Sequence, residues 1–205
     1  MTRRMMRRDT GRRPGQSARE RQQALASADP VMTVLARQLG INTAEQAWDA
    51  GARGEQHVGR LLNPLRADGW FVMHDLKVSR GGTNVDHLAI GPSGVFVIDT
   101  KNVQGSVWVG GPNIKVNGFS KDYVEKLEAQ ALLVRQALLE ETDWDSLWVQ
   151  GLLVFVKPDL HVKEQPENIV VLDDSELLPV LVNGNRRLST AQVERLARAA
   201  QAIWR

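Results

Sequence analysis

Two aspartates and a lysine lie at the ends of two apolar segments that read as a β-hairpin. Residues 84–101, NVDHLAIGPSGVFVIDTK, contain the turn-forming connection 91–94 between the two segments. If this loop closes the hairpin symmetrically, Asp86 lies opposite Asp99, and alternation places Lys101 on the same face. Like charges directly opposite each other destabilise a sheet. A hard divalent cation between the aspartates would reverse that cost.

The chemistry that this group suggests is metal-dependent hydrolysis of phosphodiesters. Carboxylate oxygens suit Mg²⁺ or Mn²⁺, and Mg²⁺ commonly binds one or two carboxylates together with water and substrate phosphate. Lys101 could orient an attacking water or stabilise the charge that builds on the phosphate. The alternative interpretation is structural, because Lys101 could simply form an ion pair with Asp99 or Asp86 at the edge of the sheet.

A glutamate on the preceding helix could add a third carboxylate. The pattern predicts a helix from Asn42 or Thr43 to about residue 66, and Glu55 lies on its apolar stripe facing the sheet. Gly51 and Gly59 on that stripe would let helix and strand approach closely. An exposed helical glutamate is the alternative interpretation.

The next predicted helix, over residues 121–141, has apolar residues at helical spacing and carries Gln130 near its apolar side. Gln130 could hydrogen-bond a catalytic group or the DNA backbone, or it could be a packed glutamine. Other predicted helices span residues 30–40, 175–182 and 190–204. Strands are predicted at residues 70–78, 106–109, 149–156 and 168–172.

Both faces of the hairpin are largely apolar, so helices must cover both of them. This predicts an α/β fold with a mixed sheet between helices. The carboxylate face would carry Leu88, Ile90, Val95 and Val97, paired as Ile90 with Val95 and Leu88 with Val97. The opposite face would carry Val85, Ala89, Phe96 and Ile98.

Several other classes of chemistry lack support in the sequence. There is no phosphate-binding P-loop and no G-x-S-x-G nucleophile elbow. The four histidines are scattered without zinc-site spacing, and His87, which follows Asp86, should point to the opposite face as a structural residue. Cysteine is absent and no apolar run could span a membrane, which fits a cytoplasmic protein.

The charge is concentrated at the N-terminus. Residues 1–21 contain eight arginines and two acidic residues, so this segment carries a charge of +6. Because the whole chain has a net charge of +2, the remaining residues carry −4. We expect residues 1–24 to form a disordered arm. It could bind phosphates without sequence preference, or it could be a solvated tail that adds solubility. A transit peptide is a third option, although the segment GRRPGQ would break a long amphipathic helix.

Three segments, in their order and spacing, resemble the nuclease-related domain, NERD, of the PD-(D/E)XK nuclease superfamily. They are residues 54–62 (GEQHVGRLL), residues 82–107 (GTNVDHLAIGPSGVFVIDTKNVQGSV) and the helix with Gln130-Ala131. The resemblance covers about residues 52–156 and implies a restriction-endonuclease-like mixed central sheet flanked by helices. Residues 25–205 would then be a NERD-like nuclease domain with a core at about 43–156 and a C-terminal helical extension.

The resemblance also implies a role for each matching residue. Glu55 would be the helix acid, Asp86 and Asp99 the metal carboxylates, Lys101 the motif lysine and Gln130 the glutamine of the following helix. The family more often has Glu at the position of Asp99, and aspartate shortens the arm that reaches the metal.

The sequence hypothesis is therefore a Mg²⁺- or Mn²⁺-dependent deoxyribonuclease that acts on DNA in processing or repair. A homodimer is left open, because many nucleases dimerise to cut both strands. The alternatives are a catalytically inactive nucleic-acid-binding module or a protein-interaction module on the nuclease fold.

Overall fold

A computed structural model describes residues 13, 14, 16, 44–79 and 81–204, with the side chains of residues 44–48 left out. Several predicted segments lie outside these residues. They are the helix at 30–40, the capping residues Asn42 and Thr43 of the next helix, and almost all of the arginine-rich arm. The division of the chain into an arm and a nuclease domain therefore stays a prediction.

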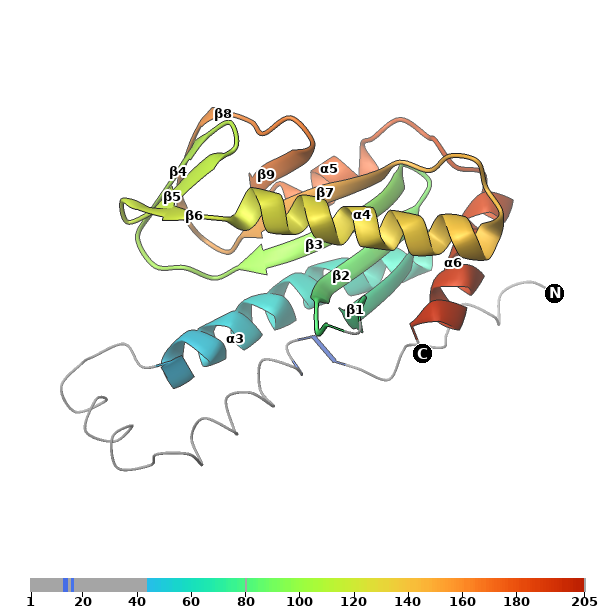
Figure 1. Ribbon diagram of the computed structural model, residues 1–205, viewed down its shortest axis with the longest axis horizontal. Helices are drawn as coiled ribbons and strands as arrows, with labels where there is room; N and C mark the ends of the chain where they lie inside the picture. Colours follow the sequence, from blue (N-terminus) through green and yellow to red (C-terminus); the bar gives the residue numbers. More distant parts are fainter. Residues whose placement is uncertain (1–12, 15, 17–43, 80, 205) are drawn as a thin grey trace.

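The main sheet is mixed and has the strand order β1-β2-β3-β7-β9 (Figure 1). The first three strands form an antiparallel meander, and β7 and β9 then add parallel to β3. Its strands are β1 (Phe71–Lys77), β2 (Asn84–Gly91), β3 (Gly94–Lys101), β7 (Val149–Phe155) and β9 (Ile169–Asp173).

A second, smaller mixed sheet has the order β6-β5-β4-β8. Its strands are β4 (Ser106–Gly110), β5 (Asn113–Val116), β6 (Phe119–Lys121) and β8 (Asp159–Glu164). The chain enters it twice, from β3 into β4 and from β7 into β8, and β4 and β8 pair in parallel as β3 and β7 do. Of these four strands, only β4 was predicted from the sequence.

Helices cover both faces of the main sheet, as the apolar hairpin predicted. The helical elements are α3 (Ala44–Leu62), the 3₁₀ helix η1 (Asn63–Asp68), α4 (Tyr123–Thr142), α5 (Leu177–Val182) and α6 (Thr190–Ile203). α4 and α6 pack on one face, together with the second sheet, whereas α3, η1 and α5 pack on the other. Figure 1 shows α4 in front of the sheet and α3 behind it. The prediction of a restriction-endonuclease-like α/β fold is confirmed.

The helix ends have local causes. Pro64 has no N–H to continue an α-helical ladder, so α3 gives way to η1 at this point. Gly69 then ends η1 in the left-handed region, with φ of 85°. The last helix begins with a reciprocal capping box, in which Ser189 and Gln192 each bond the other's backbone N–H.

The hairpin register agrees with the prediction up to the carboxylates. Ile90 pairs with Val95 and Leu88 with Val97, which confirms the symmetric closure of the turn. The ladder ends at His87, which pairs with Ile98. Asp86 and Asp99 would form the next pair but lie beyond it, where β2 pairs with β1 and β3 pairs with β7.

The side chain of Val85 lies on the face of the hairpin opposite to the one that was predicted for it. Val85 belongs to the same apolar cluster as Leu88, whereas Ala89 belongs to the cluster under α3. The strict alternation fails because the β1–β2 ladder skips the position of Asp75 and Asp86, and Asp75 has a positive φ of 54°. This irregularity reorients the pleat at the residues that carry the carboxylate.

None of the helices in the described part of the chain combines the length and apolar character needed to cross a membrane.

Candidate functional site

Asp86 is a carboxylate in an unfavourable environment. It lies where both neighbouring ladders are interrupted, and its Oδ2 accepts the backbone N–H of Thr100 at 2.7 Å. Burial raises the pKa of Asp86 well above its usual range, and repulsion by Asp99 and Glu55 raises it further. Attraction by Lys101 and the Thr100 hydrogen bond only partly oppose these effects.

Lys101 is held by two partners at the end of β3. Its Nζ lies 2.5 Å from Asp99 Oδ2 and 5.0 Å from the centre of the Tyr123 ring. Burial lowers the pKa of Lys101, but Asp99 and Asp86 more than offset this, so the net pKa lies well above the usual lysine value. The lysine is therefore a fixed cation and not a base. The Asp99–Lys101 pair that the sequence left open as a structural interpretation is formed.

Helix α3 brings Glu55 to the same end of the sheet. The close approach depends on Gly54, because a Cβ at this position would lie 2.7 Å from Asn102 Cβ. Asn102 also donates its Nδ2 to the Ala50 carbonyl at 2.8 Å. The prediction that Gly51 provides the approach is wrong, since nothing lies within 4 Å of the Cβ position there. Gly59, the other glycine of the predicted stripe, does lie close to the sheet, since a Cβ there would be 3.6 Å from the His74 ring on β1.

Gln130 reaches the backbone of β2 and not the carboxylates. Its Nε2 donates to the Asn84 carbonyl at 2.9 Å, two residues before Asp86. Its Oε1 and the Asn84 Oδ1 are buried acceptors with no hydrogen-bond partner in the described part of the chain. The structure thus places Gln130 where it positions the strand segment that carries Asp86. Buried acceptors without donors are uncommon and mark places where a ligand or ordered water would be stabilised.

The group combines three carboxylates with a lysine. Asp99 and Glu55 repel Asp86, whereas Lys101 attracts it. Carboxylate oxygens fit a hard divalent cation such as Mg²⁺ or Mn²⁺ in their chemistry. In the described residues, no three His, Cys, Asp or Glu side chains already form a set that could hold a metal ion.

Two contributors to the site were not foreseen from the sequence. Tyr123 lies at the first turn of α4 and shields the Lys101 ammonium, while the Thr100 N–H holds Asp86. No spacing in the sequence links Tyr123 to β3, because the second sheet intervenes between them. The Thr100 contact depends on the end of the β2–β3 ladder at Ile98, two residues earlier, whereas the sequence predicted that the ladder continues to Asp99.

A cavity of about 920 Å³ lies at the opposite end of β3 and contains none of these residues. It is lined in part by Ser93, Phe96, Trp144 and Trp148. This cavity therefore lies away from the carboxylate group and is not part of the candidate site.

Carboxylates and a lysine at the strand ends of a mixed sheet between helices define a class of nuclease-like proteins. Comparison with known families identifies the family within this class. Residues 50–156, over half of the chain, match the family described as nuclease-related domain. The chain belongs to this NERD family, of the PD-(D/E)XK type. The family suggests nuclease-related action on nucleic acid.

Among curated proteins, the chain is 38% identical over 64 residues to an uncharacterized protein of Bacillus anthracis. The match spans 30% of this chain and 29% of that relative. No solved structure matches the chain.

Proposed function

We propose that this protein is a Mg²⁺- or Mn²⁺-dependent nuclease that hydrolyses phosphodiester bonds of DNA. The observation that supports this most is the position of Asp86 beside the Asp99–Lys101 pair at the end of the hairpin. A purely structural ion pair needs one carboxylate for Lys101, and Asp99 already supplies it. Asp86 lies beside that pair, at a cost that its burial and its repulsion by Asp99 and Glu55 impose.

Each residue has a proposed role. Asp86 and Asp99 would hold the metal, with Glu55 completing its ligands directly or through water. A bound divalent cation supplies Lewis-acid activation of the phosphodiester. Lys101, protonated and fixed by Asp99 and Tyr123, would donate hydrogen bonds to the attacking water or to the charged phosphate oxygens. Gln130 would position the start of β2 through its bond to Asn84.

The experiment that tests the proposal is cleavage of supercoiled, linear and single-stranded DNA with Mg²⁺, Mn²⁺ or EDTA. The wild type is compared with Asp99→Ala and with Asp145→Ala, which removes an exposed carboxylate away from the site. We expect metal-dependent cleavage by the wild type and by Asp145→Ala only. Absence of metal-dependent cleavage by the wild type on every substrate would contradict the proposal.

A second candidate is a nucleic-acid-binding module without turnover. The direct Asp99–Lys101 contact favours it, because a carboxylate occupied by the lysine is less available to a metal. In the same experiment, this candidate predicts salt-sensitive DNA binding with no cleavage by any variant.

A further inference from the structure

An open cleft of about 660 Å³ borders the carboxylate group at the point where the chain leaves the main sheet. It lies between α3 and the two crossovers that run from β3 to β4 and from β7 to β8. Its lining residues are Arg53, His57, Asn102, Val103, Gln104, Gly105, Val156, Lys157, Pro158 and Asp159. The function proposed above uses none of them.

The cleft lining contains two cations, Arg53 and Lys157, against the single carboxylate of Asp159. His57 also lines it but is paired with the Asp174 carboxylate at 2.7 Å. Arg53 forms an ion pair with Asp49 on the preceding turn of α3, whereas the Lys157 ammonium has no ion-pair partner among the described residues. The side-chain amides of Asn102 and Gln104 add hydrogen-bond donors. This combination suits an anion of single charge, which is the charge of one backbone phosphodiester.

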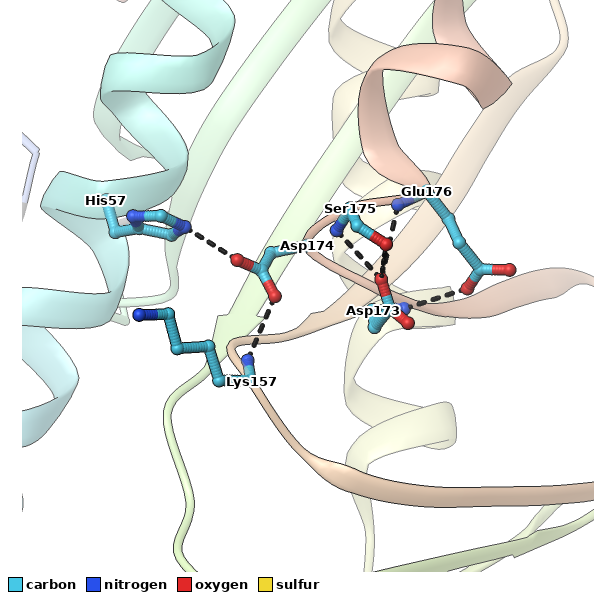
Figure 2. A network of polar contacts seen from close by, with 6 residues as sticks. All are labelled: His57, Lys157, Asp173, Asp174, Ser175 and Glu176. Atoms are coloured by element: carbon cyan, nitrogen blue, oxygen red, sulfur yellow. Dashed lines mark hydrogen bonds and ion pairs between the residues drawn. The ribbon is translucent and has the colours of Figure 1, made fainter.

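Asp174, the residue after β9, joins two walls of the cleft (Figure 2). Its Oδ2 lies 2.7 Å from His57 Nε2 on α3, and its Oδ1 accepts the Lys157 backbone N–H at 2.9 Å. Burial raises the pKa of Asp174, but the Lys157 N–H and the His57 ring outweigh it and hold the pKa below its usual value. An ionised carboxylate only accepts, so His57 Nε2 carries the hydrogen.

Two further features keep Lys157 in place. Its backbone has a positive φ of 47°, a conformation that a non-glycine residue keeps only where its surroundings determine it. The turn that carries Asp174 is itself fixed, because Asp173 Oδ1 accepts from Ser175 Oγ at 2.6 Å and from the Ser175 N–H at 2.8 Å. Figure 2 shows the Lys157 side chain extending below the His57 ring while Asp174 holds its backbone.

The cleft lies next to the proposed active site along β3 and α3. Asn102 directly follows Lys101, and the Val156 N–H donates to the Lys101 carbonyl at 2.9 Å. On α3, Glu55 lies between Arg53 and His57. A polymer whose scissile phosphate lay beside Lys101 would therefore place a neighbouring phosphate near this cleft.

We propose that this cleft binds a nucleic-acid backbone phosphate adjacent to the scissile one. Lys157 is the main cation, Arg53 contributes from the rim, and Asp174 is a positioning residue that holds Lys157 and His57. The inference rests on the proposed function, because the nuclease substrate is the polyanion that would enter the cleft.

The test measures binding of a fluorescently labelled DNA oligonucleotide by anisotropy, in EDTA and over a range of salt concentrations. Lys157→Asn removes the charge and keeps a residue type that tolerates positive φ. Its matched control, Lys163→Asn, removes an exposed lysine on β8 outside the cleft. We expect Lys157→Asn to weaken binding several-fold and to reduce the slope of log K against log salt by about one. Lys163→Asn should change neither quantity.

Asp174→Ala removes both acceptors and gives a readout that general electrostatics would move in the opposite direction. Removing a negative charge should strengthen DNA binding unless Asp174 positions the cation. We expect weaker binding, with no further loss when Asp174→Ala is added to Lys157→Asn. Stronger binding would overturn the positioning role. Thermal unfolding shows whether Lys157→Asn folds. If it does not, Arg53→Gln replaces it in the binding test. Its control is Arg60→Gln, which changes an exposed arginine on the same helix outside the cleft, and the same outcomes support or overturn the proposal.

The two proposals fail differently. Equal effects of Lys157→Asn and Lys163→Asn on binding would overturn the cleft proposal, whether or not the protein cleaves DNA. A wild type that binds DNA through Lys157 but never cleaves it would overturn the nuclease and leave the phosphate cleft standing. In an active enzyme, Lys157→Asn should raise the DNA concentration needed for half-maximal rate and leave the rate at saturating DNA unchanged.

Discussion

Adjacent residues of β2 take part in two buried polar groups that are balanced in different ways. Asp86 belongs to the carboxylate group with Asp99 and Glu55, which both repel it. His87 pairs with His74 across the β1–β2 ladder, with 2.9 Å between their Nδ1 atoms. Burial and like neighbours disfavour a charge on both Asp86 and His87, but the carboxylate group also contains Lys101, which attracts Asp86.

The histidine group forms a chain of hydrogen bonds. The Asn63 amide oxygen only accepts, so His74 Nε2, at 3.1 Å from it, carries the hydrogen. His74 Nδ1 and His87 Nδ1 share the second bond, whose donor depends on the tautomers of the two rings. Burial lowers the pKa of His87 well below its usual range, and repulsion by His74 lowers it further, so the neutral His87 ring is favoured.

The difference separates a structural polar group from one suited to function. Natural folds pair or neutralise buried charge, and exceptions concentrate at sites of chemistry. His87 follows the rule, because its neutral form is favoured. Asp86 is the more costly case, because it lies beside two other carboxylates and Lys101 only partly opposes their repulsion.

The largest expected effect is on DNA cleavage, when Lys101 of the carboxylate group is replaced. Lys101→Met should reduce DNA cleavage by about 100-fold or more, since removing a donor that stabilises developing charge has this effect in other enzymes. Stabilisation by Mg²⁺ in thermal unfolding should persist. Plasmid nicking assays measure the first quantity, with Lys77→Met, an exposed lysine of β1, as the control. Full cleavage by Lys101→Met would refute its proposed role.

The second prediction breaks the histidine group. His74→Leu should lower the free energy of unfolding by about 1–3 kcal/mol, because it leaves the buried Nδ1 of His87 without its hydrogen-bond partner. The double variant with His87→Leu should lose less than the sum of the two single changes. Denaturant unfolding measures all three, and His161→Leu on the exposed side of β8 is the control. Strict additivity would contradict the coupling of the two rings.

The pH dependence follows from the lowered pKa of His87. The folded state binds this proton less readily than the unfolded state, for which 6.5 is the reference value. Stability is therefore fully present above that pH and is lost as the pH falls toward the folded pKa. In EDTA, His87→Leu should remove this component of the acid sensitivity.

The third and smallest prediction has the opposite sign. Asp86→Asn should stabilise the metal-free protein, because it removes repulsion by Asp99 and Glu55 while its amide oxygen can still accept from Thr100. A gain of about 1 kcal/mol would raise the melting temperature by roughly 2–4 °C in a chain of this size. Because the folded pKa of Asp86 is raised, its cost is present at neutral pH and is relieved as the pH falls toward 3.8.

Calorimetry in EDTA with and without added Mg²⁺ checks this prediction. Asp68→Asn, an exposed change on η1, is the control and should have no effect. A lower melting temperature for Asp86→Asn would mean that the carboxylate serves the fold.

Much of this comparison could be predicted from local sequence. The turn at 91–94 and the flanking alternation determine the register, which places Leu88 opposite Val97. The register also placed His87 away from the carboxylates. The second sheet was largely missed because its added strands are three to six residues long and contain few apolar positions. β5 and β8 become strands by pairing with β4 and by packing against the core, and β6 pairs with β5.

The sequence by itself determined the hairpin, the α/β pattern and which acidic and basic side chains reach one end of the sheet. Those features depend on side-chain alternation and turn geometry over a few residues, which are local properties. Only the tertiary structure decided that Gly54 is the point of closest approach, that Tyr123 shields Lys101 and that Asp174 reaches His57. These contacts join segments far apart in the chain, and they depend on how helices and sheets pack as solid bodies, which no local pattern encodes.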